Sequence, residues 1–442
     1  MADTFDLILK GGTVVNHDGT GQRDIGVSGG RIAALGNLGA ARAAETIDCA
    51  GLHILPGVID SQVHFREPGL THKEDLETGS RGAVLGGVTA VFEMPNTNPL
   101  TTSAGALAAK VASARHRMFC DFAFYVGGTR ENVEDIPALE QLEGSAGIKV
   151  FMGSSTGNLL VDDEPSLDRI VGRISRRAAF HAEDEARLVS RMGERRKGDP
   201  ASHPVWRDPQ AALIATQRLV RLAEKHKRRV HVLHISTAEE MDFLAGHKAF
   251  ATVEVTPHHL TLVAPDCYER LGAYAQMNPP VRDERHRAAI WRALDQGIVD
   301  VLGSDHAPHT HEEKHHEYPG SHSGMTGVQT LLPVMLDHVN AGRLLLARLV
   351  DLTSHGPQRI FNIRGKGRIA AGWDADFSIV DMKRRVTIAN SMIASRCGWT
   401  PYDGVTVTGF PQGTVVRGRR VMWDGAILGE AGGEPVAFLE GA

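Results

Sequence analysis

Short apolar runs separated by glycine turns occupy both ends of the chain. They cover 6–9, 13–15, 24–27 and 31–35 near the amino terminus, and 377–380, 413–417 and 420–423 near the carboxyl terminus. Short β-prone runs bounded by glycine are typical of strands. The pattern predicts a small β-sandwich domain built from both termini, residues 1–53 and 373–442.

Between these regions, apolar β-like runs alternate with amphipathic helical stretches. Residues 211–226 predict a helix, because Leu213, Leu219 and Leu222 recur at helical spacing. Strands that alternate with helices are typical of a parallel sheet, and a single α/β barrel can exceed the usual length of a domain. We therefore expect the α/β class, with a TIM (β/α)8 barrel over residues 54–372 beside the β-sandwich domain.

Composition narrows the class of protein. The 442 residues are 42% hydrophobic and 23% charged, which excludes a largely disordered chain. A net charge of -5 gives no reason to expect nucleic acid or an anionic membrane as partner. The four cysteines form no CxxC pair, so neither a disulfide framework nor a thiolate zinc site is indicated. The first residues lack the features of a secretion signal, and no run reaches ~18 apolar residues, so we expect a cytoplasmic protein.

Polar side chains of metal-ligand type lie at the ends of several apolar runs in the central region. The six runs with polar ends are 54–59, 88–94, 147–152, 178–181, 229–234 and 299–305. In a TIM barrel the catalytic groups lie at the carboxyl ends of the strands. His181, His234 and Asp305 stand at three such ends, and imidazole and carboxylate are ligands that zinc accepts. Gln62 and His64 follow the first run with period-2 spacing, so both point to one face.

A single histidine at such a position is more often structural, but its recurrence at several strand ends favours a metal site. We interpret His258 and His259 as structural. Lys149 lies inside the apolar run IKVF, where a bare ammonium is costly unless it reaches solvent from the strand end.

Ordered motifs along nearly the whole chain resemble the amidohydrolase superfamily, in its cyclic-amide branch of dihydroorotases, hydantoinases and allantoinases. They are DLILKGGTVV, PGVIDSQVHFREPG, EMPNT, GIKVFMGSSTG, AFHAED, HVLHIST, VTPHHL, NPPVR, GSDHAPH, GWDADFSIVD and TVVRGRRV. The resemblance implies a site with two metal ions, zinc by preference, bridged by a carboxylated Lys149. It further implies that His181 and His234 hold one metal, and that His64 and Asp305 hold the other. A metal-activated hydroxide would then attack the ring carbonyl, and Asp305 would pass the proton to the departing nitrogen.

One position departs from this family pattern. Members of the family carry two histidines in an HxH motif after the first strand, whereas this chain has Gln62 in the first place. A glutamine carbonyl oxygen can bind a metal, but it is neutral and a weaker donor to zinc than imidazole. The metal on that side would be weakened, replaced or lost, and a single ion held by His181, His234 and Lys149 could still activate water.

Three positions bear on the substrate. Arg66 follows His64 by two residues, and its planar fork suits bidentate capture of a carboxylate, although Glu67 or Asp75 could instead pair with it. FREPG, MPNT and DHAPH together resemble dihydroorotases, which implies that Arg66, Asn96 and His309 hold the carboxylate of the substrate.

The same resemblance implies that Asn278 hydrogen-bonds the ring amide, although asparagine before a diproline also suits a turn. GIKVFMGSSTG and RGKGRIAAGWDADF are at least as similar to hydantoinases and allantoinases, so these motifs do not favour dihydroorotate.

The resemblance thus implies reversible hydrolysis of L-dihydroorotate to N-carbamoyl-L-aspartate, a step of pyrimidine biosynthesis. Two alternatives stay open: a hydantoinase-like or allantoinase-like enzyme, and a non-catalytic dihydroorotase-like subunit of aspartate transcarbamoylase. We expect a small-molecule substrate and a homo-oligomer, with residues 310–324 forming a loop over the site.

Overall fold

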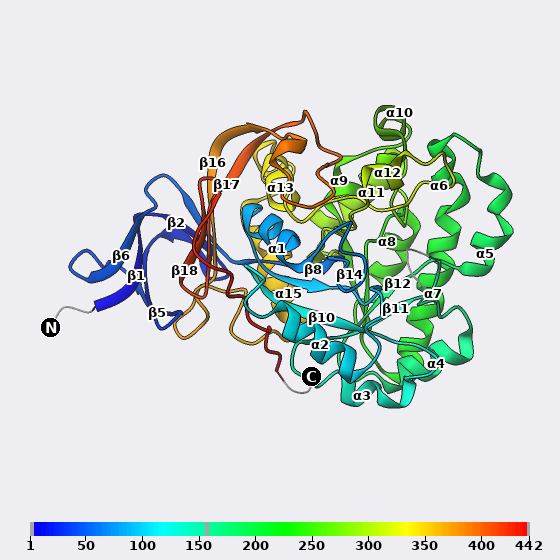
Figure 1. Ribbon diagram of the computed structural model, residues 1–442, viewed down its shortest axis with the longest axis horizontal. Coiled ribbons are helices and arrows are strands. Elements are labelled where there is room, and N and C mark those ends of the chain that lie inside the picture. Colours follow the sequence, from blue (N-terminus) through cyan, green and yellow to red (C-terminus); the bar gives the residue numbers. More distant parts are fainter. Residues whose placement is uncertain (1–3, 155–158, 440–442) are drawn as a thin grey trace.

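A parallel sheet of eight strands forms the centre of the protein (Figure 1). The computed structural model describes residues 4–154 and 159–439. In spatial order the strands are β8 (Val58–Val63), β9 (Val88–Glu93), β10 (Asp121–Gly127), β11 (Ser145–Phe151), β12 (Ala178–His181), β13 (Val230–Val232), β14 (Ala251–Val255) and β15 (Val301–Leu302). The His64 amide donates to the His306 carbonyl at 2.7 Å, which joins the segment after β8 to the segment after β15. This contact closes the sheet, and the expected TIM barrel is confirmed.

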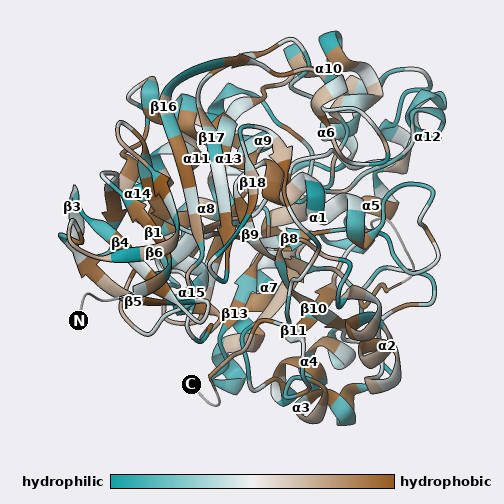
Figure 2. Ribbon diagram, turned by 60° about the vertical axis from the view of Figure 1, so that its left-hand side comes forward, coloured by the Kyte–Doolittle hydropathy of each residue, from teal (hydrophilic) through white to brown (hydrophobic). Residues whose placement is uncertain are grey.

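Helices surround the barrel strands. They are α1 (Leu76–Leu85), α2 (Ala104–Ala114), α3 (Ile136–Leu139), α4 (Glu164–Arg173), α5 (Glu185–Ser190), α6 (His203–Trp206), α7 (Pro209–His226), α8 (Ala238–Ala245), α9 (Pro257–Thr261), α10 (Asp266–Leu271), α11 (Glu284–Asp295), α12 (His311–His315), α13 (Leu331–Asn340), α14 (Leu346–Val350) and α15 (Gly356–Ile360). Hydrophilic and hydrophobic residues alternate along these outer helices (Figure 2). The helix expected at 211–226 is α7, and it begins two residues earlier because Asp208 caps it and Pro209 fits its first position.

Two further sheets, made from both chain termini, lie beside the barrel (Figure 1). Their strands are β1 (Thr4–Lys10), β4 (Asp24–Ser28), β5 (Arg31–Gly36) and β6 (Arg42–Asp48) in one sheet, and β2 (Thr13–Asn16), β3 (Gly19–Gln22), β7 (His53–Pro56), β16 (Phe377–Thr387), β17 (Thr406–Val416), β18 (Arg419–Trp423) and β19 (Ala426–Ile427) in the other. Leu7, Ile25, Phe377 and Val415 share one buried cluster, so the first and last parts of the chain form a common core. The expected β unit from both termini is present, and its domain boundaries stay a prediction.

The single strand expected over residues 54–59 is wrong. The chain leaves the terminal sheet after β7 and enters the barrel at β8, with Gly57 between the two strands. A side chain at Gly57 would clash with Thr89 and Asp376, so the crossing point requires glycine. The apolar run is therefore continuous in sequence while its two halves belong to different sheets.

Two barrel strands are shorter than their apolar runs indicate. The run at 229–234 contains only β13, and the run at 299–305 contains only β15. His234 and Asp305 have left-handed backbone conformations, with φ of 38° and 48°. Such conformations cost roughly 1–3 kcal/mol each in non-glycine residues and cluster at functional sites. The chain thus turns sharply where the predicted metal ligands stand.

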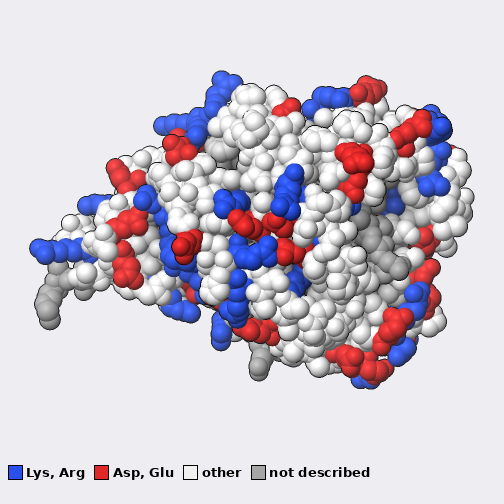
Figure 3. Space-filling model, viewed as in Figure 1, with Lys and Arg blue, Asp and Glu red and all other residues white. Residues whose placement is uncertain are grey.

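Charged side chains of both signs are interspersed on the face shown in Figure 3. Within 4–154 and 159–439, no helix combines the length and the hydropathy that crossing a membrane requires. Part of the motif GIKVFMGSSTG, residues 155–157, lies outside the described residues.

Candidate active site

One cavity at the carboxyl ends of the barrel strands collects nine of the ten predicted site residues. They are Gln62, His64, Arg66, Asn96, Lys149, His181, His234, Asn278 and Asp305. All of them except Asn278 are buried. The tenth, His309, lies behind Arg66, with its Nε2 3.3 Å from Arg66 Nη2. These residues lie at the ends of seven different strands or in the segments that follow them. Catalytic residues in TIM barrels are arranged in the same way.

His181 and His234 lie side by side in this cavity. His181 Nδ1 is 3.2 Å from His234 Nε2, and His234 Nδ1 has no hydrogen-bond partner among the described residues. Burial lowers the pKa of both imidazoles, so both are neutral near pH 7. Neutral imidazole is the form that binds metal ions.

His181 is fixed by a buried carboxylate that the sequence did not single out. Its Nε2 donates to Glu183 Oε2 at 2.9 Å, and Glu183 also forms a buried ion pair with Arg207. Burial alone would raise the pKa of Glu183, but the Arg207 charge and the His181 hydrogen bond hold it below its usual range. The proton on Nε2 leaves Nδ1 as the free lone pair that faces His234. Partners of this kind orient metal-binding histidines in other proteins.

His64 and Asp305 form the second pair. His64 Nδ1 donates to Asn96 Oδ1 at 2.7 Å, so in the neutral ring Nε2 carries the lone pair. That Nε2 lies 3.3 Å from Asp305 Oδ1. A lone pair facing a carboxylate oxygen at this distance is unfavourable unless a cation or a proton stands between them.

Gln62 contacts the same carboxylate. Its Nε2 donates to Asp305 Oδ1 at 2.9 Å, while its carbonyl Oε1 is buried without a hydrogen-bond partner in the described chain. An unpaired buried carbonyl oxygen costs roughly 1–3 kcal/mol. The side chain therefore holds Asp305 with its amide and keeps one acceptor available in the cavity.

Lys149 lies at the centre of these groups without a partner. It is 1% exposed, its Nζ makes no hydrogen bond to a described residue, and it stands 4.5 Å from the Phe151 ring centre. Burial lowers the pKa of Lys149 to about 7, although the charges of Asp305 and Glu254 act in the opposite direction. Burial likewise raises the pKa of Glu254 to about 8. A substantial fraction of Lys149 is thus the neutral amine at pH 7, which is the form that can react with carbon dioxide.

Arg66 supplies an available cationic donor at the edge of the cavity. Its Nε donates to the Pro308 carbonyl at 3.2 Å, and its Nη1 is buried without a hydrogen-bond partner in the described part of the chain. The alternatives Glu67 and Asp75 pair instead with Arg117 and Arg396.

Behind Arg66, the imidazole of His309 faces both Glu313 and Lys73. These two residues are joined by an ion pair of 2.7 Å. This arrangement fixes His309 beside the guanidinium of Arg66.

Asn278 is oriented by a histidine, His203, that the sequence did not single out. His203 Nε2 donates to Asn278 Oδ1 at 2.9 Å and also lies 3.2 Å from the Met277 carbonyl. Burial lowers the pKa of His203 to about 3, so it stays neutral. With its oxygen engaged, Asn278 presents its amide nitrogen as a donor. No local signal in the sequence connects residues separated by 75 positions.

The donors in the cavity fit a divalent metal ion of the zinc type. They combine paired neutral imidazoles, a carboxylate and an unpartnered buried amine, which are nitrogen and oxygen ligands that zinc accepts.

Two other carboxylate or histidine groups in the described residues have donor atoms close enough to hold an ion: His309, Glu313 and His322, and Asp121, Asp374 and Asp376. In each of these two groups, a lysine ammonium already pairs with the carboxylates. Lys73 pairs with Glu313, and Lys366 pairs with all three aspartates.

The chain resembles known proteins over almost its entire length. A model of the amidohydrolase family matches residues 53–421. A dihydroorotase from Methanosarcina acetivorans is 34% identical over 454 residues, covering 99% of this chain and 96% of that protein. A dihydroorotase from Halobacterium salinarum is 37% identical, covering 95% and 96%. The solved structure of an L-hydantoinase (dihydropyrimidinase) from Arthrobacter aurescens has a TM-score of 0.93 and 31% identity, and covers 98% of this chain and 99% of that one.

Proposed function

Because this chain belongs to the amidohydrolase family, we propose that it is a metal-dependent cyclic amidohydrolase that hydrolyses L-dihydroorotate reversibly to N-carbamoyl-L-aspartate in pyrimidine biosynthesis. The observation that carries this proposal is the unpaired Nη1 of Arg66 in the cavity that holds the candidate metal ligands. A buried guanidinium with a free donor suits a carboxylate. The relatives named as dihydroorotases support the same substrate.

The metal ligands follow from the two pairs in the cavity. His181 and His234 would hold one zinc ion, His64 and Asp305 the other, and a carboxylated Lys149 would bridge them. When bound, zinc supplies Lewis-acid activation of water and of the ring carbonyl at neutral pH. Carboxylation turns Lys149 from a cation into an anionic ligand, which removes the cost of an unpaired buried ammonium.

Asp305 is the proposed proton carrier. It accepts a proton from the attacking water at its carboxylate and returns it to the ring nitrogen as the carbon–nitrogen bond breaks. The products are then a carboxylate and a carbamoyl group, and no other reactant is needed. Gln62 Nε2, 2.9 Å from Asp305 Oδ1, holds this carboxylate in place.

Gln62 would also lower the affinity of the site for zinc on the His64 side. Its unpartnered Oε1 is a candidate ligand, but a neutral amide oxygen binds zinc less tightly than imidazole. We therefore infer that the ion on the His64 side is bound more weakly than the ion on the His181 side.

Polar groups of the cavity, with His309 behind Arg66, would orient the substrate. Arg66, with His309 and Asn96, would bind the ring carboxylate, and Asn278 would donate to the ring amide through the nitrogen that His203 leaves available. Binding of the charged substituent would hold the ring carbonyl in a fixed position for attack by water. Positioning of this kind lowers the entropic part of the reaction barrier.

The second candidate is a hydantoinase or allantoinase acting on an uncharged ring, which the hydantoinase structures favour. Replacing Arg66 with methionine separates the two. We expect kcat/KM on L-dihydroorotate to fall by roughly 100-fold, because a buried charged hydrogen bond is lost, and kcat/KM on hydantoin to change much less. Arg364→Met, at an exposed arginine outside the cavity, is the matched control and should leave both values unchanged. Equal losses on both rings would refute the role of Arg66 in carboxylate binding.

A third candidate is a non-catalytic dihydroorotase-like subunit of aspartate transcarbamoylase, which Gln62 favours. A preparation that contains no metal, shows no turnover and co-purifies with a transcarbamoylase would support it. We also propose that the protein assembles into a homo-oligomer and is located in the cytoplasm. Light scattering tests the first proposal and cell fractionation tests the second.

A further inference from the structure

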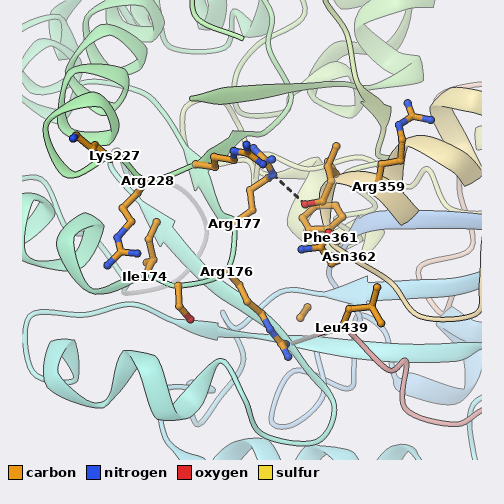
Figure 4. A pocket seen from close by; sticks show the side chains of 13 residues that line it. Ile174, Arg176, Arg177, Lys227, Arg228, Arg359, Phe361, Asn362 and Leu439 are labelled. Carbon is orange, nitrogen blue, oxygen red and sulfur yellow. Dashed lines mark hydrogen bonds between the residues drawn. The ribbon is translucent and has the colours of Figure 1, made fainter. Parts of the chain in front are cut away.

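A second cavity lies at the amino-terminal ends of the barrel strands. Figure 4 shows the side chains that line it. Its volume is about 330 Å³, which is within the usual size of small-molecule sites. It is lined mainly by the segments 174–177, 227–229 and 359–362. The first two lead into the amino-terminal ends of β12 and β13, whereas His181 and His234 stand at or beyond their carboxyl ends. The cavity is therefore separate from the candidate active site.

The walls of this cavity are strongly basic. Six cationic side chains line it: Arg176, Arg177, Lys227, Arg228, Arg229 and Arg359. No aspartate or glutamate is among the lining residues that the structure describes. Arg359 pairs with Asp351, but Arg177, Lys227, Arg228 and Arg229 form no ion pair within 4–154 and 159–439. Four of the six cationic side chains at this cavity thus have no ion-pair partner among the described residues.

Carbonyl oxygens, rather than carboxylates, accept hydrogen bonds from the half-buried guanidinium groups of Arg177 and Arg228. Arg177 Nε donates to the Ile360 carbonyl at 3.0 Å, and Arg228 Nη2 donates to the Gly172 carbonyl at 3.3 Å. Arg228 Nε is buried and has no partner among the described residues. Burial lowers the pKa of Arg177 to about 10, and the charge of Arg229 adds to this effect.

The carboxylate that acts on Arg177, Asp300, is already paired with Lys248. Carbonyl contacts fix the position of these groups but leave their charge in place. Neighbouring like charges are unfavourable in the empty cavity, and a bound anion would offset that repulsion.

We propose that this cavity binds a phosphorylated ligand with at least two phosphoryl groups, such as a nucleoside triphosphate. Arginine forks match phosphate oxygens bidentately. Four cations without an ion-pair partner in the described part of the chain favour a ligand with several negative charges. A monocarboxylate ring such as the proposed substrate carries only one. The proposal does not depend on the reaction at the other end of the barrel.

Titration calorimetry with inorganic tripolyphosphate tests it, on the metal-loaded protein at roughly 0.15 M salt, where surface charges are screened over about 8 Å. The pocket variant Lys227→Glu/Arg229→Glu changes two exposed residues, so folding is expected to be retained. Lys10→Glu/Lys383→Glu, at exposed lysines of the terminal sheets, makes the same change in net charge and is the control.

We expect one site per chain, at least tenfold weaker binding in the pocket variant, and a change of less than twofold in the control, a tenfold change being about 1.4 kcal/mol. Inorganic phosphate should bind about tenfold more weakly than tripolyphosphate, since it contacts fewer cationic side chains. Unaltered binding in the pocket variant would place the polyphosphate elsewhere, for example at the metal site, and would overturn the proposal. Absence of saturable binding, or displacement by a single-stranded oligonucleotide at equal phosphoryl concentration, would overturn it as well.

Discussion

Replacing Lys149 with methionine should make the metal-free, carbon dioxide-depleted protein more stable. Lys149 is 1% exposed, and its ammonium has no hydrogen-bond partner among the described residues. Methionine keeps an unbranched side chain of similar length and removes the charge. The substitution therefore deletes an uncompensated buried cation while it largely preserves the packing against Phe151.

The magnitude follows from the pKa of Lys149, which burial lowers from 10.5 to about 7. One pKa unit corresponds to ~1.4 kcal/mol, so at pH 7 the buried lysine costs roughly 4 kcal/mol relative to the unfolded chain. Between pH 7 and pH 10.5 the unfolded chain binds more protons than the folded one. The stability of the wild type consequently rises with pH by up to ~1.4 kcal/mol per unit, and the gain from Lys149→Met is largest at pH 7 and below and vanishes above pH 10.5.

Urea unfolding at several pH values, followed by circular dichroism, measures this difference in the free energy of unfolding. Addition of zinc and bicarbonate should stabilise the wild type and have much less effect on Lys149→Met, because only the wild type can form the carboxylated ligand. Lys314→Met is a matched control: Lys314 is also buried with its pKa lowered to about 7, but it donates to the His322 and Gly324 carbonyls. That variant should keep the response to zinc and bicarbonate. A Lys149→Met variant with the pH slope of the wild type, or with an equal gain from zinc and bicarbonate, would contradict the role given to Lys149.

The remaining predictions concern three other residues of the site. Gln62→His should raise the zinc content by up to one ion per chain in elemental analysis, since imidazole is the better ligand, whereas Gln62→Leu should not; equal contents would contradict the role given to Gln62. Asp305→Asn should lower kcat on L-dihydroorotate by about 10²–10⁴ with an unchanged dichroism spectrum, and retained turnover would exclude Asp305 as the proton carrier. Glu183→Gln should destabilise the protein by roughly 3 kcal/mol, because Arg207 loses its buried partner, and should weaken zinc binding by about 10–100-fold in a chelator competition; unchanged affinity would show that Glu183 does not orient His181.

Local sequence pattern was sufficient where strands and helices have strong periodicity. The run at 178–181 is β12 with both ends as expected, and α7 differs from its expected range only at its amino-terminal end. Lys149 could be singled out because a lysine in an apolar run is physically unusual, and the structure places it in the same cavity as His181 and Asp305. These features depend on residues that are close together in the sequence.

The features that the sequence did not reveal depend on contacts between distant segments. The chain crosses between two sheets at Gly57, where Thr89 and Asp376 leave no room for a side chain. His203 forms a hydrogen bond with Asn278, which lies 75 positions later in the sequence, and the residues around each of them do not indicate this contact. The basic cavity at the amino-terminal ends of the strands combines segments near 176, 228 and 360, which are far apart in the sequence.

The proposed activity is tested by ring opening with the purified, zinc-supplemented protein, with L-dihydroorotate, hydantoin and allantoin run in parallel. Loss of the absorbance of the ring amide follows the reaction. We expect turnover of L-dihydroorotate that disappears when zinc is chelated and returns when zinc is restored. Turnover of only the uncharged rings would contradict the substrate assignment, and absence of turnover on all three by a zinc-loaded protein would contradict the proposed enzyme.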